Sequence, residues 1–177
     1  MKSRFSILAI LFIGCVLIGY RVHYSNLGAE KKAFSITQWD AFGYYHYLPA
    51  TFIYHDLKTW KWADDIDRKY NVTGGGGLPV VALDNGNKVC KYLGGVAILQ
   101  LPFFGIGHCI AGLAHYPQDG FSAPYQYSLA FGAILYSLLA LVLLMVVLRR
   151  FFSDVVTAVT LILLTLASNF LQYSAVH

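Results

Sequence analysis

The chain has 177 residues, of which 57% are hydrophobic and only 12% are charged. Soluble domains carry roughly 25% charged residues, so the composition excludes an ordinary soluble domain and predicts a membrane protein. The formal net charge of +4 is modest, and the basic residues form no cluster of the kind that binds nucleic acid. We therefore expect a single membrane domain over 1–177 with no nucleic-acid partner.

The first predicted element is an apolar run at about 5–22, which is near the lower length limit for a helix that spans hydrocarbon. A cleavable signal peptide is an alternative, because a short basic segment precedes the run. The segment Phe12 to Cys15 also faintly resembles a lipoprotein cleavage sequence. No small-residue cleavage site follows the run, which favours an uncleaved transmembrane helix.

A polar loop at about 23–92 follows, and its basic and acidic residues are nearly balanced. Its acidic cluster at 64–67 precedes Arg68 and Lys69, a pattern more typical of a solvated helix start than of a metal site. Farther along, two short runs flank Asn85-Gly86, and this dipeptide predicts a small β-hairpin.

The most aromatic part of this loop is the stretch 39–54. We predict one helix that begins at Ile36 or Thr37 and ends at Tyr47, and a second that opens at Pro49, since proline is tolerated in a first turn. Tyrosine rings favour the boundary between lipid and water. The two short helices are therefore expected to lie at the membrane surface.

Three more apolar segments follow, at about 93–114, 125–148 and 155–173. Together with the first run they predict an all-α membrane protein of about four transmembrane helices. Interfacial helices and a small β-hairpin would lie in its first extracytoplasmic loop.

Charge alone leaves the orientation open. A basic N-terminal tail favours the cytoplasm, but four full spans would then place Arg149 and Arg150 outside, against the positive-inside tendency. The chain inverted as a whole is one alternative. A re-entrant hairpin at 93–114, broken by proline, is another, and it makes both basic clusters cytoplasmic. We favour a cytoplasmic N-terminus with the loop 23–92 outside.

Three motifs occur in a fixed order along the chain. They are Trp39 to Leu57 (Trp-Asp-x-x-Gly-Tyr-Tyr-x-Tyr-Leu-Pro-Ala-x-Phe-Ile-Tyr-x-Asp-Leu), Lys91 to Phe104 (Lys-Tyr-x-Gly-Gly-Val-Ala, then Leu-Pro-Phe-Phe) and Asp119 to Gln126 (Asp-Gly-Phe-Ser-x-Pro-Tyr-Gln). As an ordered set they resemble bacterial polytopic membrane glycosyltransferases of the GT-C type, which are related in layout to protein O-mannosyltransferases and to lipid A aminoarabinose transferase.

The resemblance implies an enzyme of the bacterial inner membrane that takes a hexose or pentose from a polyprenyl-phosphate-linked donor. It also implies a catalytic acid in the first external loop, and Asp40 is the only acid in the matching helix. Asp40 is thus the candidate base, or the candidate ligand of a divalent cation such as Mg²⁺ or Mn²⁺. Lys91 would lie near the lipid phosphate. Relatives usually have eight or more spans, so this chain is expected to be an amino-terminal portion.

Further candidates for contact with sugar or phosphate are Tyr44, His46 and Tyr47, because aromatic faces suit sugar rings. On a helix, Asp40, Tyr44 and Tyr47 share one face. Asp119 is a weaker candidate, since Asp-Gly strongly favours a turn. The rival hypothesis is a non-catalytic membrane subunit or a transporter fragment, but transporters tend to carry ionisable residues within their spans, and these segments carry almost none.

Overall fold

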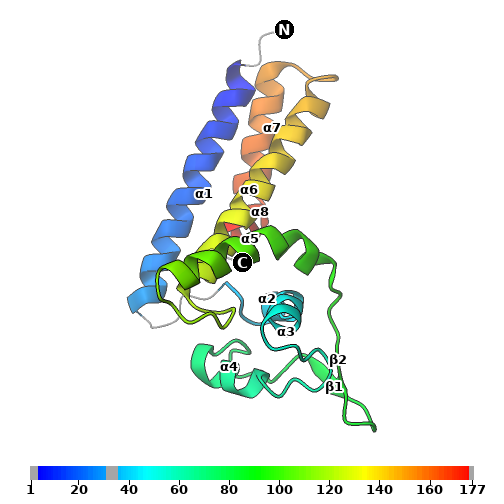
Figure 1. Ribbon diagram of the computed structural model, residues 1–177. Coiled ribbons are helices and arrows are strands. Elements are labelled where there is room, and N and C mark those ends of the chain that lie inside the picture. The colour runs from blue at the N-terminus through cyan, green and yellow to red at the C-terminus, as the bar shows by residue number, and fades with distance from the viewer. Residues whose placement is uncertain (1–3, 31–35, 176–177) are drawn as a thin grey trace. The chain divides into compact units, whose positions relative to one another are not determined.

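The computed structural model describes residues 4–30 and 36–175 and is mostly helical (Figure 1). Its helices are α1 (Arg4–Glu30), α2 (Asp40–Tyr45), α3 (Tyr47–Phe52), α4 (Ala63–Tyr70), α5 (Gly95–Leu113), α6 (Ala123–Leu148), α7 (Asp154–Leu166) and α8 (Phe170–Ala175). Its strands are β1 (Val80–Ala82) and β2 (Lys88–Cys90). The predicted helical class with one small hairpin is confirmed at this level.

Three helices in the described part of the chain are long and apolar enough to cross a membrane: Arg4–His23 within α1, α5 and α6. The predicted fourth span, 155–173, is wrong as one continuous helix, because α7 has 13 residues and extends only about 20 Å. The Ser168 hydroxyl donates to the carbonyl of Leu164 and accepts from the backbone N–H of Phe170. This side chain thus competes with the helical backbone at the break.

The chain divides into two compact units, and α6 contributes to both. The first unit comprises α1 up to Leu27 and the chain from Ala130 onward. Its core is apolar and is formed by Ile13, Leu17, Leu141, Leu161 and Ala175. These residues come from four helices, which explains why long apolar segments distant in sequence form one bundle.

Asp154, the first residue of α7, connects two helix ends in this first unit. Its carboxylate accepts from the backbone N–H groups of Phe5 and Ser6, at 2.8 and 3.2 Å, and from the Ser6 hydroxyl. The first N–H groups of a helix have no partner within it. Asp154 therefore caps α1 and holds the N-terminal ends of α1 and α7 together.

The second unit, Gly28–Leu129, contains the hairpin and the short helices. β1 and β2 pair in antiparallel fashion, with Val81 opposite Val89, and Gly86 has the positive φ of 80° that the turn requires. This confirms the hairpin. α4 carries acids in its first turn and basic residues in its last, as predicted, and both complement the helix dipole.

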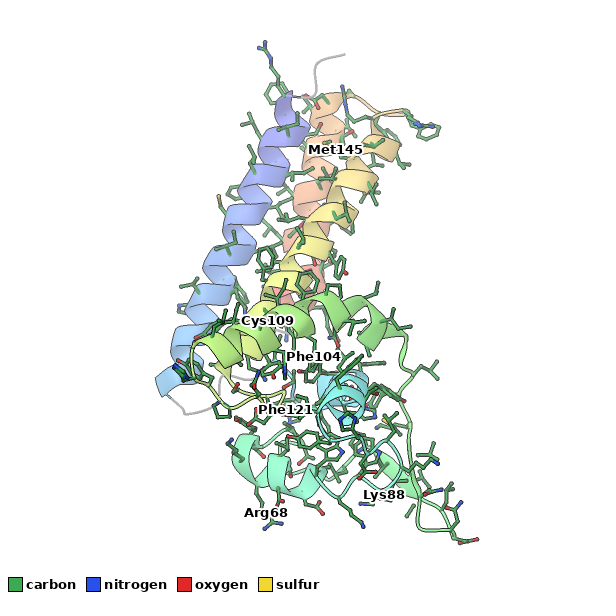
Figure 2. The ribbon with its side chains drawn as sticks, in the orientation of Figure 1. Arg68, Lys88, Phe104, Cys109, Phe121 and Met145 are labelled. Atoms are coloured by element: carbon green, nitrogen blue, oxygen red, sulfur yellow. The ribbon has the colours of Figure 1, made fainter. Side chains whose placement is uncertain are left out.

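The core of the second unit is aromatic. The ring of Phe42 in α2 contacts those of Trp60 and Phe121, with centroids 6.1 and 6.0 Å apart. Phe104 brings α5 against this core through Tyr45 (6.2 Å) and Tyr125 (5.5 Å). Figure 2 labels Phe104 and Phe121. α5 continues through Pro102 without interruption, so the hairpin broken by proline is not what the structure shows.

The predicted start of the first aromatic helix was three or four residues too early. The backbone N–H of Ile36 donates to the Gln126 side chain (2.9 Å), whose amide donates to the Thr37 hydroxyl. Trp39 then adopts a positive φ of 53°, and its backbone N–H bonds the carbonyl of Val72. These tertiary contacts hold 36–39 out of the helix, which begins at Asp40.

Candidate functional site

All three sequence motifs lie in the second unit and are joined by side-chain hydrogen bonds. The Tyr47 hydroxyl of the first motif donates to the carbonyl of Tyr92 in the second, at 2.5 Å. The Tyr45 hydroxyl donates to the carbonyl of Gly120 in the third, also at 2.5 Å. Segments 45 and 75 residues apart therefore assemble around the two short helices α2 and α3.

Asp40, Tyr44, Lys91 and Tyr92 form a group at the surface, which we call the Asp40 cluster; Tyr44 and Tyr92 are half-buried. The Tyr92 hydroxyl donates to the Asp40 carboxylate, and the Tyr92 ring meets the Tyr44 ring edge-on with centroids 4.7 Å apart. The Lys91 ammonium lies 4.9 Å from the centroid of the Tyr92 ring. Asp40 and Lys91 are both exposed. A carboxylate and an ammonium thus flank one tyrosine at the surface.

Gly43 allows Tyr92 to reach Asp40. A Cβ on this glycine would lie only 2.0 Å from Cδ2 of Tyr92, so any larger residue would force the ring away. The Cys90 thiol bonds the carbonyl of Gly43 (3.6 Å), and Tyr47 fixes the backbone of Tyr92 from the other side. The end of β2 is therefore held against α2.

The hydrogen bonds of the Asp40 cluster favour a protonated Lys91 and a neutral Tyr92. The hydrogen bond of the Lys91 ammonium with Tyr92, together with the charge of Asp40, raises the pKa of Lys91. The hydrogen bond to Asp40 raises the pKa of the Tyr92 phenol. At neutral pH the cluster consequently presents a protonated lysine and a neutral tyrosine beside the carboxylate.

His46, predicted to contact substrate, lies in the interior instead. Its side chain is only 1% exposed, its ring lies 4.2 Å from that of Trp60, and Nδ1 bonds the carbonyl of Gly43 at 2.9 Å. Burial lowers the pKa of His46 to about 4. The described placement gives His46 a packing role, so it lends the substrate prediction no support.

Asp119 is surrounded by more partners than Asp40. One carboxylate oxygen accepts from the Lys69 ammonium (2.8 Å) and the Tyr70 hydroxyl (2.6 Å). The other accepts from the backbone N–H groups of Phe121 and Ser122, each at 3.0 Å. Burial opposes ionisation of Asp119, but the hydrogen bonds from Lys69 and Tyr70 outweigh it and lower the pKa. Asp119 closes a turn, as its Asp-Gly sequence indicates.

The donor set for a divalent cation is sparse. Within the described ranges 4–30 and 36–175, no group of three or more His, Cys, Asp or Glu side chains is placed to hold a metal ion. In the acidic cluster of α4, Asp65 pairs with Arg68 (3.1 Å) and Asp67 accepts from the backbone and hydroxyl of Thr73. Those carboxylates serve the fold, as expected of a solvated helix.

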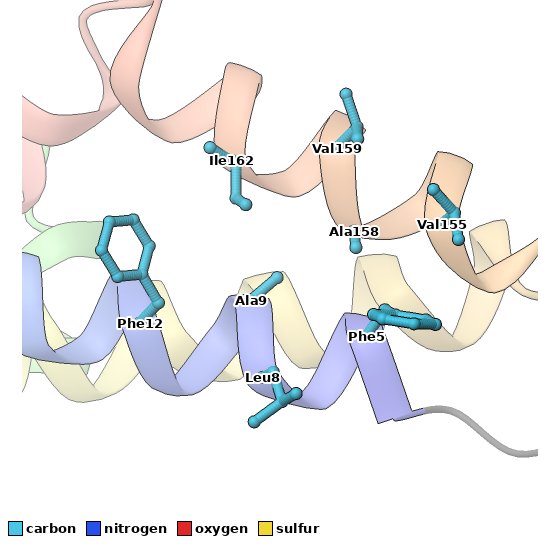
Figure 3. Close-up of a pocket in the computed structure, with 8 residues that line it drawn as sticks. All are labelled: Phe5, Leu8, Ala9, Phe12, Val155, Ala158, Val159 and Ile162. Carbon is cyan, nitrogen blue, oxygen red and sulfur yellow. The ribbon is translucent and has the colours of Figure 1, made fainter.

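The first unit contains an apolar groove of about 340 Å³ between α1 and α7 (Figure 3). Its lining consists of Phe5, Leu8, Ala9, Phe12, Val155, Ala158, Val159 and Ile162. None of these side chains can donate a proton, accept one or carry charge. The groove therefore offers contact to hydrocarbon and no catalytic group.

Two residues of the site were not predicted from the sequence. Tyr92 belongs to the Asp40 cluster, and Gly43 makes room for its ring. Both stand inside the quoted motifs, so the ordered tyrosines and glycines were the available signal. The chain matches no family model, and comparisons with curated proteins and with solved structures find no match either. The function is therefore inferred from the side-chain geometry of the second unit and from the sequence motifs.

Proposed function

We propose that the chain is a membrane glycosyltransferase in which Asp40 is the catalytic base. The observation that carries the proposal is the exposed Asp40 carboxylate, held by the Tyr92 hydroxyl beside the Lys91 ammonium. Among the described residues, Tyr92 supplies the one hydrogen bond to this carboxylate. Its other acceptor positions are open to a substrate hydroxyl.

The proposed reaction transfers a hexose or pentose from a polyprenyl-phosphate-linked donor to an acceptor hydroxyl. Asp40 removes the proton from that hydroxyl, whose oxygen attacks the anomeric carbon of the sugar. The bond from that carbon to the phosphate oxygen breaks, and its electron pair leaves with the polyprenyl phosphate. The Lys91 ammonium stabilises the negative charge that grows on the leaving phosphate.

The backbone next to Asp40 supports a role beyond folding. Trp39 has a positive φ of 53°, a conformation that costs on the order of 1–3 kcal/mol and often occurs at functional sites. A purely structural role would rest on the dipole of α2, but this helix has only six residues. The dipole contribution at an exposed end is about 0.3–1 kcal/mol, and the hydrogen bond from the Trp39 backbone to the carbonyl of Val72 holds the strained conformation in place.

Of the two roles predicted for Asp40, its surroundings favour the base over the metal ligand. Magnesium is usually held by one or two carboxylates together with substrate phosphates, so the number of carboxylates does not separate the two roles, but the Lys91 ammonium beside Asp40 does. That ammonium would repel a divalent cation and already supplies positive charge. The proposed step therefore uses no cation, and we expect transfer to persist in EDTA.

We further propose, from the family resemblance, that the protein resides in the bacterial inner membrane with the loop 23–92 outside. There the Asp40 cluster would meet the lipid-linked donor at the membrane surface. Tyr44 and Tyr47, both half-buried on α2 and α3, are the proposed contacts for the sugar ring. Membrane lipids and the donor are thus the expected partners.

The test replaces Asp40 by Asn in the full protein and measures transfer in membranes from a panel of radiolabelled polyprenyl-phosphate hexoses and pentoses. Loss of a positioned base lowers the rate by about 10²–10⁴-fold. The matched control is Asp84→Asn, an exposed carboxylate in the hairpin turn, which should leave transfer unchanged. Equal turnover of wild type and Asp40→Asn would remove the catalytic role and favour a non-catalytic membrane subunit.

A further inference from the structure

α5 meets the length and hydropathy criteria of a membrane span, but it is the least apolar of the three helices that do. Its mean hydropathy is 1.7, against 2.2 for α1 and 2.8 for α6. A helix that crosses the membrane must leave its two flanking segments on opposite sides. Contacts between those segments therefore decide whether α5 crosses.

The segments before and after α5 are directly bonded to each other. Lys69 and Tyr70 of α4, which precede α5, both bond the Asp119 carboxylate, which follows it. The Tyr54 hydroxyl also donates to the carbonyl of Asp119, at 2.8 Å. The Lys69 side chain is 52% exposed, so this ion pair belongs in water or at the interface. Both flanks of α5 then lie on one side of the membrane.

The connection after α5 is too short to return across the membrane. Only 114–118 separate the end of α5 from Asp119, and an extended chain of this length spans about 20 Å at most. The hydrocarbon core is about 30 Å thick. If α5 ended on the far side, Asp119 could not reach Lys69.

Contacts in the first unit independently indicate that α5 does not cross the membrane. Asp154 accepts hydrogen bonds from the backbone of Phe5 and Ser6, so Asp154 lies at the same membrane face as the start of α1. The chain from Ser6 to Asp154 must therefore cross the membrane an even number of times. α1 and α6 share one apolar core and have the two highest hydropathies. With both of them crossing, α5 cannot be a third span.

The two faces of α5 differ in what they contact. Gln100 and His108 lie on the face that is turned to protein, along with the buried Phe104, and His108 Nδ1 shares a hydrogen bond of 2.6 Å with the Tyr125 hydroxyl. Every exposed side chain along α5 is hydrocarbon except the thiol of Cys109, which behaves as a small hydrophobe. The largest exposed fractions belong to Leu113 (83%) and Ile98 (73%). So large an apolar face requires a partner other than water.

We propose that α5 is a non-crossing helix that lies in the leaflet on the side of Asp40, with its exposed apolar face against lipid acyl chains. Interfacial helices of this kind insert their apolar face about 5–10 Å below the headgroups. The chain then crosses twice between Ser6 and Asp154, and Arg4 shares one side with Arg149 and Arg150. The positive-inside tendency is satisfied without inverting the chain.

Labelling of single cysteines in intact cells tests this topology. Cys15, Cys90 and Cys109 are replaced by Ala, and Asp84→Cys, Tyr116→Cys and Arg150→Cys are introduced one at a time at exposed positions. In intact cells, a membrane-impermeant maleimide should either label positions 84 and 116 and leave position 150 unlabelled, or label position 150 alone. Labelling in permeabilised cells is the control for the reactivity of each cysteine. Any other pattern overturns the proposal, whichever way the protein faces.

A depth measurement tests the same proposal in the reconstituted full chain. Nitroxide labels are attached to Ile98→Cys, Ile106→Cys or Leu113→Cys, all on exposed parts of α5, and their exposure to oxygen and to a polar nickel reagent is compared. Similar, shallow depths at all three positions support the interfacial helix. A maximum depth at position 106, with shallow values at 98 and 113, is the profile of a crossing helix and would overturn it.

Discussion

The second unit contains two groups built from the same three residue types. Asp119 is paired with Lys69 and Tyr70, and Asp40 is paired with Lys91 and Tyr92. The Asp119 carboxylate accepts four hydrogen bonds and is 16% exposed. Asp40 accepts one hydrogen bond in the described structure and is exposed.

The difference separates a structural carboxylate from an available one. At Asp119, protein donors occupy both oxygens, so little capacity is left for a substrate. At Asp40, one tyrosine orients the carboxylate and the adjacent lysine supplies positive charge, while the remaining lone pairs face outward. The same Lys-Tyr dipeptide thus contributes to a saturated, half-buried carboxylate in one place and flanks an exposed carboxylate in the other.

The largest expected effect on stability comes from Asp119→Ala. The change leaves the Lys69 ammonium, the Tyr70 hydroxyl and two backbone N–H groups without their acceptor, and we expect a loss of about 3 kcal/mol. All three tryptophans lie in the second unit, so tryptophan fluorescence during denaturant unfolding in detergent reports on it. Asp84→Ala is the control and should change stability by less than about 0.5 kcal/mol. Equal stabilities of the two variants would refute the structural role.

A smaller effect is expected from the buried His46, through pH. Burial lowers its pKa from 6.5 to about 4 in the folded protein, so the unfolded chain takes up a proton first as the pH falls. The contribution of His46 to the unfolding free energy is fully present above its pKa in the unfolded chain. It is lost as the pH falls toward its pKa in the folded protein, and the loss is about 2 kcal/mol between pH 7 and pH 5. His46→Asn should reduce this dependence of the unfolding free energy on pH. An identical pH profile in the variant would show that His46 is not the group responsible.

The smallest expected effect is that of Tyr92→Phe in the Asp40 cluster. The variant removes the hydrogen bond to Asp40 but keeps the ring over Gly43, and an exposed bond contributes about 1 kcal/mol or less to stability. We expect transfer to fall about 3–10-fold, because the carboxylate loses its orienting donor and a bond of this strength corresponds to such a factor. Tyr116→Phe, at an exposed tyrosine outside the cluster, is the comparison. A rate equal to that of the comparison would remove Tyr92 from a positioning role.

The features that follow from local sequence were predictable. Long apolar runs predicted α1, α5 and α6, Asn85-Gly86 predicted the hairpin turn, and the charges of α4 complement its dipole. Each of these properties depends on residues close together in the chain. The resemblance further directed attention to Asp40 and Lys91, which the structure brings into one group.

The features that depend on distant contacts were not predictable. Gln126 holds the backbone before α2 from 90 residues away. The break at Ser168 is local, since its hydroxyl bonds the backbone of Leu164 and Phe170, but hydrophobic periodicity does not reveal it. His46 was predicted to contact sugar or phosphate, but its side chain is buried against Trp60. Pairs such as Lys69 and Asp119, 50 residues apart, leave no local pattern in the sequence.

The comparison between the two carboxylates is tested most directly by the turnover of Asp40→Asn per folded molecule. Transfer from the polyprenyl-phosphate sugar panel is divided by the folded fraction from tryptophan fluorescence, with Asp119→Asn treated in parallel. We predict that Asp40→Asn unfolds like the wild type while its turnover falls by about 10²–10⁴-fold, and that Asp119→Asn unfolds more easily. Wild-type turnover per folded molecule of Asp40→Asn would contradict the central claim.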